Sequence, residues 1–366
     1  MPRKIRSISK RIAITLNVLA ILVMFLVGYA DRLNPASFPH LCSVGLTFPF
    51  WLGLNVLFLI FWAFTRWRML WLPVLGLIVC YGPVRRYCPF NPSAEAPHGS
   101  LKVLSYNVFM YSEWDGSAGV DNHLIQYLLH SDADIICLQE ASDYGMKGMT
   151  PIQCLRRYYP YCSQTVKKGI AADCLLIASR YPILEQDSIP IGSGGDMSME
   201  YILDVNGKRV CVINNHLESN RLSAEDKAEF KSLVKGEMNH QEMKDESVYL
   251  INKLGVAATK RAKQAAIIRQ RIQKRLDEKI PVITMGDFND NPLSYCHRVI
   301  SQGLTDCYTA SGNGPGISYH RSGIYVRIDH IMCSDFFKPY GATVDSSVAY
   351  SDHYPIYCWL EMRPKP

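Results

Sequence analysis

What this sequence lacks already excludes several classes of protein. Its twelve cysteines form no Cys-x-x-Cys pair, so a zinc ribbon or zinc finger has no support. It contains no internal repeat and no low-complexity tract, which excludes a repeat architecture. Charged residues make up only 20% of the chain against 48% hydrophobic residues, so the chain is not disordered and can bury a sizeable core.

Acidic residues are almost missing from the first quarter of the chain. Residues 1–98 hold ten Lys or Arg and two acids, whereas the other 268 residues hold 29 basic and 31 acidic residues. The net charge of +6 therefore arises in the N-terminal quarter, and the rest carries a balance of −2. A domain with that balance has no overall basic field to attract nucleic acid, although local patches remain possible.

The same quarter contains long runs without charge. Residues 12–30 and 44–64 are each long enough to cross a membrane as a helix. A third run, 69–84, is shorter and holds Pro73, which predicts a short span or a re-entrant segment. Four tryptophans lie in or beside these runs, as interfacial anchors do. We expect residues 1–86 to form a membrane anchor with two or three transmembrane helices.

The orientation of this anchor follows from its positive charges. The first run resembles a signal peptide in its basic start and its Gly28-Tyr29-Ala30 ending, but its length and the runs after it favour an uncleaved span. Arg66 and Arg68 place the loop after the second run in the cytoplasm, together with the N-terminus. Three spans would then put the rest of the chain on the extracytoplasmic side, although Arg85 and Arg86 argue mildly against it.

Residues 87–99 are rich in Pro, Ala and Ser and predict a linker, after which short apolar runs end in polar residues. Asn206-Gly207 predicts a hairpin turn, 120–130 a helix, and 223–279 a long polar helical region. The expected strands are 101–106, 134–138, 174–178, 202–205, 209–214, 281–285, 324–332, 342–348 and 354–360. Several strands that each deliver an acid, an amide or a histidine at one end predict a site at one edge of a sheet.

The cysteines of this region are best interpreted as small buried residues rather than as ligands. Five of them fall in the expected strands: Cys137, Cys174, Cys211, Cys333 and Cys358. Cys154 and Cys162 are a candidate disulfide if the domain lies outside the cytoplasm.

Eight polar residues at the strand ends carry the chemistry: Asn107, Glu140, His216, Asp287, Asn289, Asp329, Asp352 and His353. Carboxylate and amide oxygens suit Mg²⁺ or Mn²⁺, and the lack of a cysteine cluster disfavours zinc. A metal that polarises a phosphoryl oxygen, a carboxylate that activates water and a histidine or amide that stabilises the transition state make a phosphoester hydrolase. Each residue alone could belong to a turn, a cap or a core, but their order along the chain forms a complete set.

Seven motifs in order resemble those of the endonuclease/exonuclease/phosphatase (DNase I-like) superfamily, in a membrane-anchored member of bacterial type. They are LKVLSYN (101–107), DIICLQE (134–140), SRYPI (179–183), NHL (215–217), GDFN (286–289), RIDHI (327–331) and SDHYP (351–355). The resemblance covers residues 100–362. It implies a four-layer α/β sandwich, in which two mainly antiparallel sheets pack face to face with helices outside.

The resemblance also implies a metal site. Glu140 would be the principal ligand, and Asn107 and Asp352 would complete or support the site. The ion would be Mg²⁺ or Mn²⁺, and no organic cofactor is implied.

The catalytic roles implied by the resemblance fall to five residues. Asp287 would orient or deprotonate the attacking water, and Asn289 would hold the scissile phosphate. His353 would face that phosphate, with Asp329 fixing its ring. His216 would stabilise the transition state or assist the leaving group, and its His-Leu pattern is more like the DNase, sphingomyelinase and phosphoinositide phosphatase branches than the apurinic-site endonucleases.

The sequence therefore predicts a membrane-anchored phosphoesterase that acts on a lipid head group or a small phosphoester, with the bilayer as partner. A membrane-tethered nuclease is the alternative, supported by the basic segment 260–275. We interpret Arg261, Gln264, Ile268, Arg271 and Arg275 in that segment as the solvated face of a helix whose Ala262, Ala265, Ala266 and Ile272 pack on a sheet. An inactive binding module is least expected, because no member of the set is missing.

The mixed-charge segment 224–254 follows the His216 strand and predicts a solvated lid that sets substrate preference. The oligomeric state is left open.

Overall fold

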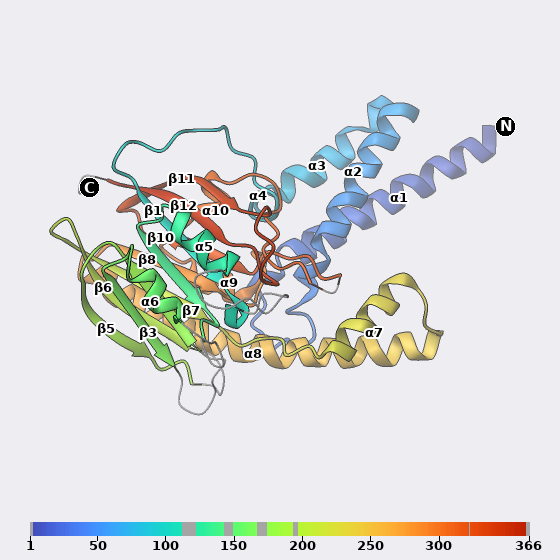
Figure 1. Ribbon diagram of the computed structural model, residues 1–366. Coiled ribbons are helices and arrows are strands. Elements are labelled where there is room, and N and C mark those ends of the chain that lie inside the picture. The colour runs from blue at the N-terminus through green and yellow to red at the C-terminus, as the bar shows by residue number, and fades with distance from the viewer. Residues whose placement is uncertain are drawn as a thin grey trace.

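Two six-stranded sheets packed face to face form the body of the protein, and a group of apolar helices extends from one side of it (Figure 1). The computed structural model describes residues 3–111, 122–142, 149–166, 174–192, 197–321 and 323–363. Helices cover the outer faces of both sheets, so the expected four-layer α/β sandwich is confirmed.

The N-terminal helical region consists of α1 (Arg3–Gly28), α2 (Phe48–Thr65), α3 (Trp71–Val79) and α4 (Tyr81–Tyr87), with short 3₁₀ turns η1 (Ala30–Arg32), η2 (Val44–Thr47) and η3 (Trp67–Met69). Ser9–Arg32 and Val44–Thr65 are long and apolar enough to cross a membrane, and α3 and α4 form a third candidate bent by 68°. Buried amides join these helices, since the Trp62 indole donates to Asn17 at 3.1 Å and Asn55 donates to the Pro73 carbonyl at 3.0 Å.

The first sheet has the order β11-β12-β1-β2-β4-β3. Its strands are β1 (Leu101–Asn107), β2 (Ile135–Gln139), β3 (Tyr161–Val166), β4 (Cys174–Ser179), β11 (Phe337–Val344) and β12 (Ile356–Met362). Only β1 and β2 are parallel. The helices α5 (His123–His130) and α6 (Pro151–Leu155) pack on its outer face, and η4 (Phe109–Tyr111) follows β1.

The second sheet has the order β5-β6-β7-β8-β10-β9. Its strands are β5 (Ile183–Ile189), β6 (Met197–Val205), β7 (Lys208–His216), β8 (Val282–Asp287), β9 (Thr305–Asp306) and β10 (Asp329–Cys333). Here β7 and β8 are the parallel pair. The long helix α8 (His240–Asp277) and α9 (Tyr295–Ile300) pack on its outer face, α7 (Ala224–Lys235) lies against α8, and α10 (Cys307–Ser311) follows β9.

The core between the sheets is built from strand positions that alternate between their two faces. Val103 and Ile135 of the first sheet and Tyr201, Val212 and Ile283 of the second are fully buried there. The expected hairpin at Asn206-Gly207 is confirmed, because both residues have positive φ (53° and 82°) and join β6 to β7.

Several expected boundaries were wrong. The strand expected over 324–332 begins only at Asp329, because the Ser318 hydroxyl accepts the backbone N–H groups of Ile328 and Asp329 and holds the preceding segment out of the ladder. The strand expected over 342–348 lies at Phe337–Val344, and the helix expected over 120–130 begins at His123. Residues 120 and 121 lie outside the described residues. The edge strands β3 and β5 were missed.

The cysteine interpretation is confirmed for the five strand residues, which are all buried. Cys154 and Cys162 are both free thiols, so the candidate disulfide does not form in this structure.

The segment expected to be a linker does connect the helical region to the sandwich, but part of it is attached to the domain. The Asn91 side chain donates to the carbonyls of Thr309 and Gly312, and the Asn91 N–H donates to the Asn313 side chain at 2.7 Å. The helical region is therefore held against the sandwich by these hydrogen bonds and is not joined to it by a free linker.

Candidate active site

The ends of four strands meet at one edge of the sandwich. β1 ends at Asn107, β7 at His216 and β8 at Asp287, and Glu140 directly follows β2. Two strands of a parallel pair end at the same edge, so the pairs β1–β2 and β7–β8 bring these four polar side chains together. This edge holds a cleft of about 230 Å³.

All eight residues expected from the sequence lie at this edge. Six line the cleft: Glu140, His216, Asp287, Asn289, Asp352 and His353. The other two, Asn107 and Asp329, are buried behind it and bond to members of the first six.

The backbone at the site takes up conformations that most residues avoid. Glu140 and Asn289 have φ of 50° and 51°, in the left-handed region that disfavours ordinary L-residues. Gly286 has φ of 138°, and a Cβ there would lie 2.0 Å from the Asn215 carbonyl oxygen, so only glycine fits before Asp287. The motif Gly-Asp-Phe-Asn is thus a backbone requirement as well as a chemical one.

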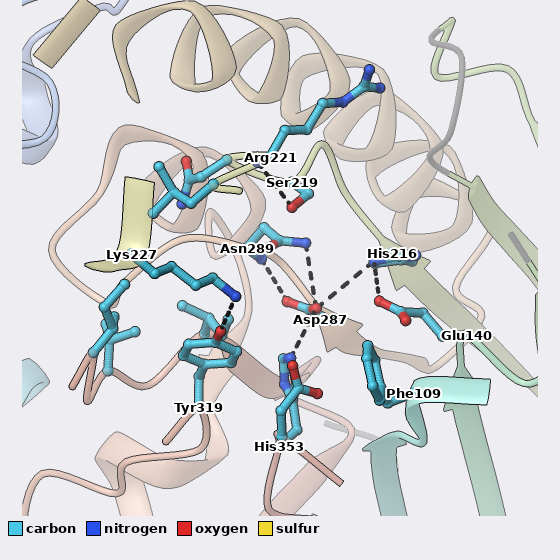
Figure 2. A pocket seen from close by; sticks show the side chains of 16 residues that line it. Phe109, Glu140, His216, Ser219, Arg221, Lys227, Asp287, Asn289, Tyr319 and His353 are labelled. Carbon is cyan, nitrogen blue, oxygen red and sulfur yellow. Dashed lines mark hydrogen bonds and ion pairs between the residues drawn. The ribbon is translucent and has the colours of Figure 1, made fainter. Parts of the chain in front are cut away.

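Asp287 is the centre of the network (Figure 2). Its Oδ1 accepts the Asn289 N–H at 2.8 Å, and its Oδ2 accepts the Asn107 amide at 3.1 Å. The Nε2 atoms of His353 and His216 approach the same Oδ2 at 3.7 and 3.8 Å. Burial raises the pKa of Asp287, and the charge of His353 opposes that rise.

His353 is held between two carboxylates. Its Nδ1 lies 2.8 Å from Asp329 Oδ2, which fixes the ring so that Nε2 faces Asp287 and the cleft. The Tyr319 ring packs edge-on against the imidazole at 5.2 Å between centroids. Burial alone would lower the pKa of His353, but Asp329 and Asp287 outweigh it and raise that pKa well above its ordinary value. The two carboxylates therefore favour the protonated, positively charged form of His353.

The residues expected to hold a metal are short of positive partners. Glu140 Oε1 accepts the Asn107 amide at 3.1 Å and faces His216 Nε2 at 3.6 Å. Within the described part of the chain, no Lys or Arg forms an ion pair with Glu140 or Asp352. Two carboxylates in one cleft that form no ion pair with a described Lys or Arg fit a hard divalent cation with oxygen ligands.

A tighter group of possible ligand atoms exists at Asp287, Asp329 and His353, whose ligand atoms lie within 4.8 Å of one another. These three residues already satisfy each other by hydrogen bonding and charge. A protonated imidazole cannot bind a metal ion, so we interpret this group as a hydrogen-bonded triad and leave the cation to Glu140 and Asp352.

His330, the sequence neighbour of Asp329, points to the other face of β10. Its Nε2 donates to the Asp290 carbonyl at 2.9 Å, and its ring contacts His297 and Phe288. This outcome follows from the alternation of side chains along a strand.

Sequence reasoning missed Phe109, Arg221 and Tyr319 at the rim of the cleft, whereas the expected lid segment 224–254 does bring Lys227 to this rim. Lys227 on α7 donates to the Tyr319 hydroxyl at 2.8 Å, and no carboxylate of the described residues pairs with it (Figure 2). The only signal for Lys227 was its place soon after His216, and Tyr319 lay in no recognised motif. The rim thus adds an unneutralised cation to the site.

The basic segment of α8 proved to be different from the solvated face expected. Arg261, Gln264 and Ile268 are buried, whereas Ala266 is exposed. Arg261 pairs with Asp290 at 3.1 Å. Arg271 and Arg275 both bond to Glu200, also a buried residue, at 3.1 and 2.6 Å. The apolar face expected at Ala262, Ala265 and Ile272 is buried as predicted. The buried face is wider than expected because these arginines reach carboxylates of the sandwich.

Comparison with known proteins identifies the family and supports the fold. The model of the Endonuclease/Exonuclease/phosphatase family matches residues 104–353, and a domain of unknown function matches residues 10–87. No curated protein matches this sequence.

Among solved structures, the human Nocturnin catalytic domain with a bound sulfate anion aligns with a TM-score of 0.53 and 16% identity, over 74% of this chain and 96% of that one. Truncated TDP2 from Caenorhabditis elegans aligns with a TM-score of 0.51 and 17% identity, over 73% and 99%. At such identities these likenesses show the fold. Together with the family match, the fold and the site lead to one conclusion: this chain belongs to the endonuclease/exonuclease/phosphatase family and is a metal-dependent hydrolase of phosphoester bonds.

Proposed function

We propose that this protein is a membrane-anchored, Mg²⁺-dependent phosphoesterase that hydrolyses a lipid head group or a small phosphoester by in-line attack of water. The observation that carries the proposal is that one cleft holds two carboxylates without described Lys or Arg partners, Glu140 and Asp352, beside Asp287 and His353. Asp329 fixes the His353 ring from behind the cleft. A phosphoryl transition state develops negative charge on the phosphoryl oxygens and on the leaving-group oxygen. A cation site beside a positively charged donor can stabilise both.

The metal would be held by Glu140, with Asn107 and Asp352 in support. When bound, Mg²⁺ polarises a phosphoryl oxygen and offsets negative charge on the phosphate. Asn107 already lies between Glu140 and Asp287, so it ties the cation side of the site to the carboxylate at its centre. The Ser351 hydroxyl donates to the Asn107 carbonyl at 2.8 Å and keeps the Asp352 loop against β1.

The remaining steps belong to side chains that face the cleft. Asp287 orients the attacking water and accepts its proton, because its Oδ2 faces the Nε2 atoms of both histidines at the cleft, at 3.7 and 3.8 Å. Asn289 gives an amide N–H to the phosphate in exchange for its contact with Asp287, which is long at 3.3 Å, and keeps its bond to the Leu217 carbonyl at 3.0 Å.

Both histidines donate. The charged His353 gives an N–H to a phosphoryl oxygen from Nε2, and Asp329 holds the ring for that purpose. His216 lies at the end of β7, on the Glu140 side of the cleft, and donates an N–H to the leaving-group oxygen.

Membrane anchoring is supported by the junction between the helical region and the domain. Val27 of α1 and Phe48 of α2 pack in one cluster with Leu293 of the sandwich. The two helix ends next to the domain are therefore the end of α1 and the start of α2, and Figure 1 shows the other ends pointing away from it. With α1 and α2 crossing the bilayer and α3–α4 returning, the domain lies on the face opposite to Arg66 and Arg68.

This arrangement supports an extracytoplasmic catalytic domain in a multi-pass protein. Arg85 and Arg86, which argued the other way, have structural partners: Arg86 pairs with Asp31 at 2.7 Å and Arg85 donates to Asn91 at 2.9 Å. Their place near the domain is explained by these contacts rather than by membrane orientation.

The nuclease alternative loses its main support. Arg261, Arg271 and Arg275 of the basic segment bond to carboxylates of the domain itself, so they offer no free positive surface for a nucleic acid backbone. Nucleic acid stays the less favoured partner. An inactive binding module stays least favoured, because six of the eight expected residues line one cleft.

The test is hydrolysis by the full-length protein in lipid nanodiscs with Mg²⁺. We expect turnover of bis(p-nitrophenyl) phosphate and of a lipid from a panel of sphingomyelin and phosphoinositides, and little turnover of DNA. Faster turnover of DNA than of every lipid would establish the nuclease alternative instead.

A further inference from the structure

The loop between α1 and α2 lies on the helix α8. The Thr259 hydroxyl donates to the Pro35 carbonyl at 3.2 Å, and Gly255 faces Pro39 so closely that a Cβ would lie 2.6 Å from its carbonyl oxygen. Pro35 thus meets Thr259 and Pro39 meets Gly255, so the loop runs antiparallel to α8 and is fixed along it.

Large apolar side chains beside this contact are exposed to solvent. Phe38 and Leu41 of the loop are 48% and 49% exposed, and Val248 and Ile251 of α8 are 52% and 42% exposed. Val248, Ile251 and Gly255 are spaced by three and four residues, which places them on one face of the helix. That face is the one against which the loop packs, so the four side chains form a single surface.

This surface continues the apolar helices of the N-terminal region. The loop joins the two helix ends that contact the domain, and if α1 and α2 cross a bilayer it must lie where the bilayer ends. In Figure 1, α7 and the first half of α8 extend from the sandwich on the same side as α1, α2 and α3. Apolar side chains in that position lie against the lipid surface instead of water.

The same surface is tied to the mouth of the cleft. α7 begins at the rim, where Lys227 lines the cleft, and its Asp226 pairs with Lys253 of α8 at 2.5 Å. The Ser223 and Asp226 capping box fixes the start of α7 as well. A bilayer that supports α8 therefore also sets the position of Lys227 and the cleft.

We propose that Phe38, Leu41, Val248 and Ile251 form a bilayer-docking surface that holds the cleft at the membrane face, so that the substrate is a phosphoester embedded in the membrane. This inference rests on the proposed function and narrows it, since a freely diffusing phosphoester would gain nothing from such a surface.

The test compares two substrates in the full-length protein reconstituted in phosphatidylcholine vesicles. One is water-soluble bis(p-nitrophenyl) phosphate, and the other is sphingomyelin or a phosphoinositide in the same vesicles. The variant carries Val248→Asp and Ile251→Asp, which place charge on exposed positions and should leave the fold intact. The matched control is Leu184→Asp, because Leu184 is an equally exposed aliphatic residue (52%) on β5.

We expect the double variant to keep its rate on the soluble diester and to lose about tenfold or more on the vesicle lipid, while Leu184→Asp changes neither. Circular dichroism melting checks the fold of each variant. Equal lipid turnover by the double variant and the wild type would overturn the inference, as would a wild type that cleaves the soluble diester but no vesicle lipid. Failure of the wild type on both substrates would instead count against the proposed function.

Discussion

Two clusters of histidine and carboxylate lie on opposite faces of β10, and they resemble each other in composition. One is Asp287, Asp329 and His353, and the other is His297, Asp306 and His330; in each, the possible ligand atoms lie within 4.8 Å of one another. Neighbouring residues of one strand supply both, because Asp329 and His330 point to opposite faces. Only the first cluster reaches the cleft.

The difference between them is the balance of charge. His353 faces two carboxylates, which raise its pKa well above the ordinary value. Burial lowers the pKa of His330 well below the ordinary value, with His297 and Arg327 adding to the effect against Asp306. A histidine that faces two carboxylates is therefore a charged donor on one face, whereas a buried histidine beside one carboxylate and a second histidine is neutral on the other.

Chelation should separate the site from the fold. EDTA should abolish hydrolysis, and Mg²⁺ or Mn²⁺ should restore it, because Glu140 and Asp352 offer oxygen ligands without basic partners. The melting temperature should change little, since the buried cluster is held by its own hydrogen bonds, such as His297 to Asp306 at 3.2 Å. Full activity after exhaustive chelation would contradict the proposed chemistry, and a large fall in melting temperature would assign a structural ion to the protein.

Removing the two histidines should have opposite outcomes. His353→Ala should lower kcat by roughly 10²–10³-fold, as the loss of one transition-state donor does. His330→Ala should lower stability, because it removes a buried side chain, and should leave kcat close to the wild-type value. Steady-state kinetics on bis(p-nitrophenyl) phosphate measure both. An active His353→Ala variant together with an inactive His330→Ala variant would show that the active site lies on the His330 face of β10.

Asp329 and His353 should behave as one unit. Asp329→Asn should cost less than His353→Ala, about tenfold in kcat, since it weakens the hold on the ring but leaves the donor in place. The double variant should be no slower than His353→Ala alone. Additive losses in this double-mutant cycle would mean that Asp329 acts independently.

Lys227 should contribute to binding of the anionic substrate, with a smaller effect on activity than His353 or Asp329. Lys227→Met removes the unpaired cation at the rim, and we expect about a fivefold fall in kcat/KM, equivalent to roughly 1 kcal/mol. The control is Lys263→Met, an exposed lysine of α8 away from the cleft. Equal effects of the two substitutions would show a general loss of charge rather than a contact with substrate.

Lowering the pH should lower the stability of the fold through the buried His330. The folded pKa of His330 is below its unfolded value of about 6.5, so unfolding takes up a proton as the pH falls below that value and stability decreases. His330→Gln should be spared about 1 kcal/mol of this loss between pH 7 and pH 5.5, or about 2–4 °C in Tm. Melting curves at the two pH values test it; parallel losses in both proteins would mean that other groups dominate.

Much of the site could be predicted because four of its residues stand next to a strand end in sequence. Asn107, Glu140, His216 and Asp287 follow apolar runs directly, so local pattern alone places them at sheet edges. The same pattern identified the long apolar runs and the hairpin at Asn206-Gly207. Strand boundaries were less accurate at β10, where the Ser318 side chain rather than the local pattern ends the ladder.

The sequence by itself determined the family, the strand-end positions of Asn107, Glu140, His216 and Asp287, and the two long apolar helices. Only the tertiary structure decided that Lys227 meets Tyr319, that Arg261 is buried against Asp290, and that the loop after α1 lies on α8. These contacts join segments far apart in the chain, and nothing local requires them. They depend on how the packed elements orient one another, which residue periodicity does not encode.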